Sequence, residues 1–138
     1  MLLRRYEKLS GHVSTPVAEI WDEVSRAEVG AFLLSLANPR HAHEYRHFER
    51  VSLPDAALIV PGVIDTTTNY VEHPEAVADR IERVVTAVGD PARVIAGTDC
   101  GFETSAGFQS VAPEVAWQKF RSLVEGAALA SRRLFGRS

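Results

Sequence analysis

Asp65, Asp99 and Cys100 are the residues of this sequence best placed to do chemistry. Asp65 directly follows a short apolar run, and Asp99 and Cys100 follow a later one. A carboxylate can hold an amine by hydrogen bonds, and a cysteine thiolate can bind a metal ion. Because the carboxyl ends of parallel strands meet at one end of a sheet, the sequence predicts a shared site.

Two of these residues also have a structural interpretation. Asp65 can instead order the turn formed by Thr66–Thr68. Cys100 can be a small buried residue, as free cysteines often are. Arg40, in the loop after the first apolar run, can clamp a carboxylate of a substrate or pair with Glu44 or Asp65.

His41 and His43 lie in that same loop, two positions apart. On a strand both would share a face, whereas in a loop the spacing means little. We expect them to order a substrate or the loop, with a metal-binding or a purely structural role as alternatives. A metal-dependent amidohydrolase using both histidines and Asp99 is a further alternative, but the preceding Asn38-Pro39 context does not fit it.

The elements that must position these residues alternate along the chain as α-β-α-β-α-β-α. Apolar runs predict strands at Val29–Leu34, Ala57–Val63 and Arg93–Ala96, and apolar periodicity predicts helices at 16–27, 74–88 and 113–134. This order is typical of a parallel sheet with amphipathic helices, an α/β fold. The residues expected to pack in the helical core are Trp21, Trp117 and Phe120, and those expected to cap a helix are Thr15, Glu72 and His73.

The length and composition limit the class of protein. The 138 residues fit one domain, expected at 15–138 after a poorly defined segment at 1–14. The net charge of −3 gives no reason to expect a nucleic-acid partner, and no run is apolar enough to suggest a membrane partner. A single cysteine and the lack of a signal peptide favour a cytoplasmic protein.

Four motifs resemble the cobalamin-independent methionine synthase superfamily, in its shorter methionine synthase II-like branch. Together they extend over most of positions 29–125, and their order and spacing make the resemblance fairly specific. The motifs are Asn38-Pro39-Arg40-His41-Ala42-His43-Glu44, Leu58-Ile59-Val60-Pro61-Gly62-Val63-Ile64-Asp65, Val71-Glu72-His73-Pro74-Glu75 and Ala96-Gly97-Thr98-Asp99-Cys100-Gly101-Phe102.

The resemblance implies the C-terminal portion of a β/α barrel, about three βα units. It also implies a zinc-dependent reaction in which a thiol such as homocysteine accepts a methyl group from 5-methyltetrahydrofolate, or an alkyl group from a related donor. Carried onto this sequence, Cys100 matches a metal ligand. We expect catalytic roles for Asp99 and His41, and substrate-binding roles for Arg40, His43 and Asp65, where the aspartates could hold an amine or a pteridine ring.

The sequence departs from that family in its metal ligands. The family uses a His-x-Cys pair, a glutamate and a late cysteine, whereas Ser35 stands at the glutamate position and no His-x-Cys occurs in the chain. Two interpretations follow: a zinc-dependent thiol methyltransferase, or a truncated, non-catalytic remnant that has lost zinc.

A partial barrel also leaves two edges of its sheet unpaired, here the runs Val29–Leu34 and Arg93–Ala96. Side chains expected to point into the barrel, such as Phe32 and Leu34, would lack the opposite wall. We therefore expect the chain to associate with itself or with a complementary barrel fragment.

Overall fold

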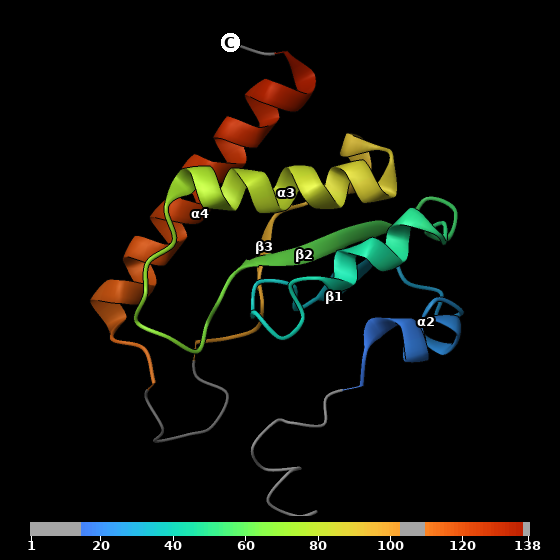
Figure 1. The fold of residues 1–138 in the computed structure, drawn as a ribbon, viewed down its shortest axis with the longest axis horizontal. Coiled ribbons are helices and arrows are strands. Elements are labelled where there is room, and N and C mark those ends of the chain that lie inside the picture. Colours follow the sequence, from blue (N-terminus) through green and yellow to red (C-terminus); the bar gives the residue numbers. More distant parts are fainter. Residues whose placement is uncertain (1–14, 103–109, 137–138) are drawn as a thin grey trace, which may run out of the picture.

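The fold is a small parallel sheet with helices packed on one face (Figure 1). The structure, a computed structural model, describes residues 15–102 and 110–136. The elements are, in chain order, α2 (Val17–Val24), β1 (Ala31–Leu34), the 3-10 helix η1 (Glu44–Glu49), β2 (Leu58–Ile64), α3 (Pro74–Val88), the 3-10 helix η2 (Pro91–Arg93), β3 (Gly97–Thr98) and α4 (Pro113–Phe135).

The sheet has the order β1-β2-β3, and both strand pairs are parallel. Phe32 of β1 lies opposite Ile59 of β2, and Gly62 of β2 lies opposite Gly97 of β3. The parallel sheet predicted from the sequence is therefore confirmed, with β2 at its centre. All three strands end on the same side, so the loops that follow them lie together.

The third strand lies later than predicted. Pro91 begins a short 3-10 turn, and the Asp90 carboxylate accepts the backbone N–H of Ala92 at 2.9 Å to cap it. The Arg93 guanidinium then donates to the carbonyl of Ala57, which fixes the turn against the start of β2. The expected run Arg93–Ala96 therefore contributes one bridge, between Val94 and Ile59, before the strand forms.

The first helix is shorter than the predicted 16–27. Pro16, rather than Thr15, is the N-cap, and no side-chain hydrogen bond caps the helix from within its own segment. The N–H of Val17 instead donates to Oε2 of Glu44 at 2.8 Å. A partner 27 residues away sets the start of α2, which local sequence signals do not encode.

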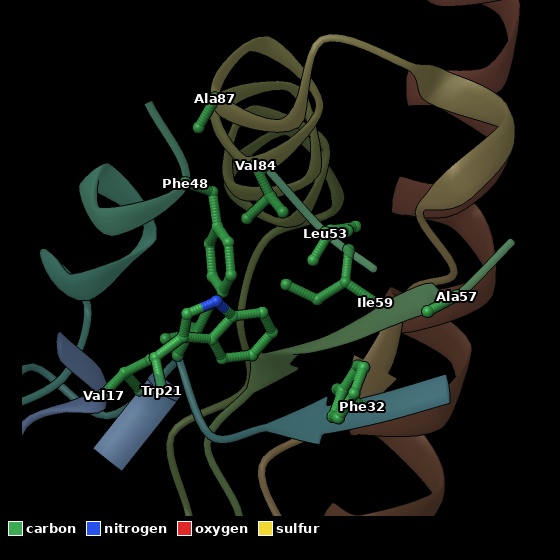
Figure 2. Close-up of a cluster of buried hydrophobic side chains, with 10 residues drawn as sticks. Val17, Trp21, Phe32, Phe48, Leu53, Ala57, Ile59, Val84 and Ala87 are labelled. Carbon is green, nitrogen blue, oxygen red and sulfur yellow. The ribbon is translucent and has the colours of Figure 1, made fainter. Parts of the chain in front are cut away.

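Trp21 lies at the centre of the first hydrophobic cluster, as predicted (Figure 2). Its ring meets those of Phe32 and Phe48 edge-on, with centroids 5.2 and 5.0 Å apart. Phe32 therefore points toward the helices, which corrects the expectation that it points into the barrel. Side chains alternate along a strand, so Leu33 occupies the opposite face, where it is 74% exposed.

α3 begins and ends as the sequence predicts. The His73 side chain accepts the backbone N–H of Glu75 at 3.2 Å, Pro74 opens the helix, and Gly89 closes it with a left-handed φ of 82°. One face of α3 forms a second hydrophobic cluster with β2 and α4. Its buried residues include Val63, Ile64, Val77, Ala78, Ile81, Val85 and Ala130.

The buried residues of α4 are Lys119, Ser122, Gly126 and Ala130, none of them aromatic. At Gly126 a Cβ atom would lie 2.5 Å from the Val77 side chain, so only glycine allows this approach. Trp117 and Phe120, predicted to pack in the core, are instead 74% and 40% exposed. The apolar periodicity correctly predicted the helix, but the face of α4 that is buried is not the face that carries the aromatic residues.

A buried ion pair joins α4 to the segment after β2. Lys119 Nζ lies 2.9 Å from Glu72 Oε2, and both side chains are almost wholly excluded from solvent. Glu72 Oε1 accepts the N–H of Asp65 at 2.8 Å, and the Ser122 hydroxyl donates to the Glu72 carbonyl. Glu72 thus caps no helix itself and instead fixes the chain that follows β2.

Over residues 15–102 and 110–136, no helix combines the length and the apolar character that crossing a membrane would require.

Lys119→Met is expected to lower the free energy of unfolding by about 3–5 kcal/mol, because it removes the nearer cation of the buried Glu72 carboxylate and leaves only Arg80, 3.6 Å away. Urea denaturation followed by circular dichroism measures this change. The double variant Lys119→Met/Glu72→Gln keeps an acceptor for Asp65 and should recover part of the loss. A loss below about 1 kcal/mol in Lys119→Met would contradict this account of the pair.

Gly62→Ala is expected to destabilise the fold by about 1–3 kcal/mol, because the new Cβ would lie 2.0 Å from Asp99 Oδ1 and 2.6 Å from its Cα. Gly30→Ala is the matched control, since no heavy atom lies within 4 Å of a Cβ there. Thermal unfolding of both variants measures the difference. Equal midpoints would show that β3 can move away from Gly62 without loss.

Candidate functional site

Asp99 joins the loop after β3 to the loop after β1. Its Oδ1 and Oδ2 accept the backbone N–H groups of Ala37 and Asn38, each at 2.8 Å. In return the Ser35 hydroxyl donates to the Asp99 carbonyl at 2.7 Å. The side chain crosses over Gly62 of the intervening strand to make these contacts, which requires a residue without a Cβ there.

The environment of Asp99 raises the pKa of its carboxyl group. Burial is the largest cause, and the hydrogen bonds from Ala37 and Asn38 partly offset it. The negative charge of Asp65 raises the pKa further. Asp99 thus takes up a proton more readily than an ordinary aspartate does.

Asp65 lies at the end of β2 and is 9% exposed. Its Oδ1 accepts both the backbone N–H and the hydroxyl of Thr67, at 3.0 and 2.7 Å, and its Oδ2 accepts the Thr68 hydroxyl at 3.0 Å. The turn-ordering interpretation of Asp65 therefore describes its contacts in this structure.

Those contacts lower the pKa of Asp65. Burial alone would raise this pKa, but the hydrogen bonds from Thr67 and Thr68 outweigh it, and the charge of Lys119 contributes in the same direction. The two aspartates have pKa values shifted in opposite directions, Asp65 downward and Asp99 upward. Such a divergence separates a carboxylate that stays ionised from one that can carry a proton.

Cys100 is exposed, which corrects the alternative that it is a small buried residue. Its Sγ lies 3.2 Å from the hydroxyl of Thr66, in the loop after β2. The Thr98 hydroxyl donates to the Cys100 carbonyl at 3.1 Å. The thiol thus lies at the same end of the sheet as Asp65 and Asp99.

The loop after β1 uses His41 to hold neighbouring elements. His41 Nδ1 lies 2.6 Å from Glu44 Oε1, and the other oxygen of Glu44 accepts the N–H of Val17. These contacts order η1 and the start of α2. A catalytic role for His41 is untested and stays a prediction.

Arg40 and His43 are both exposed in this loop. The backbone N–H of Arg40 donates to Oδ1 of Asn38 at 3.0 Å, and His43 is the residue before η1. Their substrate-binding roles also stay predictions. The structure thus brings Ser35, Asp65, Asp99 and Cys100 together, and it places Arg40, His41 and His43 in the adjoining loop.

Sequence reasoning missed the buried partners of Asp65, which are Glu72 and Lys119. One signal was available: Lys119, Ser122, Gly126 and Ala130 recur at i, i+3, i+7 and i+11, a stripe of one helix face. Small residues along a stripe allow close helix packing. A lysine within it must then find a buried acid.

The described residues do not fit a zinc site. A structural or catalytic zinc ion takes three or four protein ligands. Within residues 15–102 and 110–136, no group of three or more histidine, cysteine, aspartate or glutamate side chains is arranged to hold a metal ion. Ser35, at the position where the family resemblance places a glutamate, donates its hydroxyl to Asp99 instead.

Comparison with known proteins supports the fold. The chain is similar to the structure of a B12-independent methionine synthase from Shewanella sp. W3-18-1 in complex with selenomethionine. The two share 22% identity with a TM-score of 0.70, over 86% of this chain and 31% of the other. No family model and no curated protein matches the chain.

This chain therefore has the fold of part of a methionine synthase barrel, and it spans less than a third of the solved chain's length. The predicted fold class, a partial β/α barrel, is confirmed.

Proposed function

We propose that this chain is a segment of a thiol methyltransferase of the B12-independent methionine synthase type. It supplies Asp65, Asp99 and Cys100 to the catalytic end of the barrel. The observation that carries the proposal is the convergence of these residues at the carboxyl end of a parallel sheet, where β/α barrels build their sites. The structural likeness to a methionine synthase supports the same assignment.

In this proposal the two aspartates do different work. Asp65 stays ionised and holds the amine of an amino-acid substrate, because its threonine contacts and Lys119 keep its pKa low. Asp99 fixes the loop after β1, and its raised pKa suits it to carry a proton beside the substrate. Cys100 presents an exposed thiol at the same place.

The residues at 15–102 and 110–136 do not by themselves supply everything that this chemistry needs. Zinc would stabilise a substrate thiolate, but the described residues provide no ligand set for it. In this proposal the remaining ligands lie on other strands of the barrel. The alternative function, a non-catalytic remnant of the barrel, rests on this same lack of ligands together with Ser35 at the expected glutamate position.

The chain is expected to lose zinc on dialysis and to transfer no methyl group by itself, because one cysteine cannot hold the ion tightly. Metal analysis by plasma mass spectrometry, before and after dialysis, measures this. Stoichiometric zinc that is retained by the original chain and lost in Cys100→Ser would contradict the expectation. It would also point to His41 or His43 as additional ligands.

L-Methionine is expected to bind weakly and to shift the backbone amide signals of residues 65–68 and 99–101 in a heteronuclear NMR titration. Asp65→Asn should abolish these shifts, because the neutral amide no longer attracts the ammonium group. Asp55→Asn is the matched control, since Asp55 is exposed just before β2, at the opposite end of the sheet. Shifts that survive in Asp65→Asn would refute the role of Asp65, and a titration without any shifts would favour the remnant.

A further inference from the structure

A cavity with two chambers lies between η1 and α3. The inner chamber, of about 40 Å³, reaches from Tyr45 of η1 to Gly62 of β2. The outer chamber, of about 330 Å³, opens to solvent beside Glu49. Tyr45 and Arg83 line both chambers, so the two meet at these residues. Both walls of the cavity thus belong to elements that the structure describes.

The inner chamber is lined by two guanidinium groups, those of Arg80 and Arg83 on neighbouring turns of α3. Arg80 Nη1 donates to the carbonyl of Val63 at 2.8 Å and lies 3.6 Å from Glu72 Oε1. Glu72 has a nearer cation in Lys119, at 2.9 Å. Arg83 is exposed and forms no ion pair within residues 15–102 and 110–136. Both arginines can therefore bind an anion in the chamber.

The size and the walls of the inner chamber suit a carboxylate. A single water needs roughly 10–15 Å³ of such space, so about 40 Å³ holds a group of about three heavy atoms. A carboxylate has three, and its plane matches the fork of a guanidinium group. The other walls are mostly apolar and limit the access of water, which strengthens a charged contact. They are formed by Leu36, Ala42, Gly62, Val63 and Val84.

The outer chamber has the opposite charge. The carboxylates that line it are those of Glu49, Asp79 and Glu82, against one guanidinium group, that of Arg83. Arg133 of α4 pairs with Glu82 at 2.9 Å and offsets part of this charge, as Arg46 does near Glu49. The remaining excess attracts a positive group and repels a second negative one. A ligand that fits both chambers is therefore negative at one end and positive at the other.

We propose that this cavity is a further binding site, and that it takes a small amino carboxylate. The carboxylate of the ligand lies on Arg80 and Arg83 in the inner chamber. Its ammonium group faces Glu49 and Asp79 in the outer chamber. The site goes beyond the proposed methyl transfer and does not depend on it.

The cavity is separate from the candidate functional site but close to it. Asp65, Asp99 and Cys100 line neither chamber. Arg80 connects the two places, because it lies 3.6 Å from the same Glu72 oxygen that accepts the N–H of Asp65. A ligand on Arg80 thus lies next to the contacts that hold Asp65.

A heteronuclear NMR titration with 4-aminobutanoate tests the proposal. We expect it to shift the backbone amide signals of Leu36, Ala42, Gly62 and Val84, which line the inner chamber. Butanoate should bind about threefold more weakly, since an ion pair in the open outer chamber contributes little. Butylammonium should cause no shifts at these residues. The absence of shifts with 4-aminobutanoate overturns the proposal, as does equal binding of butanoate or of butylammonium.

Two variants identify the cavity as the place of binding. Arg83→Gln should weaken binding about fivefold or more, because it removes a charge-assisted hydrogen-bond donor. Ala42→Leu should abolish binding, because it fills the inner chamber and changes no charge; Ala42 is exposed, so a larger side chain can be accommodated. Arg121→Gln is the matched control, an exposed arginine on α4 that lines neither chamber.

Circular dichroism checks that each variant folds, and Arg83→Gln, at an exposed position, serves by itself if Ala42→Leu does not fold. Unchanged binding in a folded Arg83→Gln or Ala42→Leu variant overturns the proposal. An equal loss of binding in Arg121→Gln also overturns it, because the effect would then reflect the overall charge of the protein and not the cavity.

Discussion

The approach of Asp99 over Gly62 is the constraint on which the candidate site depends. The carboxylate accepts two backbone N–H groups of the loop after β1, and it can reach them only because β2 has no side chain at position 62. One residue thereby holds the loops after β1 and β3 in a fixed relation. Because Cys100 is the next residue, the same contacts also restrict its position.

The loop after β2 is fixed by contacts that lead to α4. Glu72 accepts the N–H of Asp65 and forms a buried ion pair with Lys119 of α4. A buried pair of this kind is a weak source of net stability, but it leaves little freedom in the position of either partner. The last helix thus influences both the geometry and the ionisation of Asp65, although it contributes nothing to the sheet.

These two anchors give the aspartates contrasting electrostatic environments. Hydroxyl donors and a buried cation surround Asp65, whereas burial and a neighbouring negative charge dominate at Asp99. The contrast needs no metal ion, because it arises from the chain's own residues. The described part of the barrel thus sets the ionisation of both aspartates at the carboxyl end of its own sheet.

The sequence by itself determined the order of the elements, the parallel sheet and the end of the sheet where polar residues gather. Apolar runs, proline and glycine punctuation and helical periodicity are local signals, and they located β2, α3 and α4 to within one residue at either end. The resemblance in the loop motifs correctly predicted the barrel-type fold. Contacts between distant residues decided what remained. Glu44 sets the start of α2. Arg93 bonds the carbonyl of Ala57, and β3 begins only after the turn that this bond holds. In α4, Lys119 is buried and Trp117 is exposed. Each of these outcomes depends on a partner far away in the chain, whose position is known only once the fold has formed.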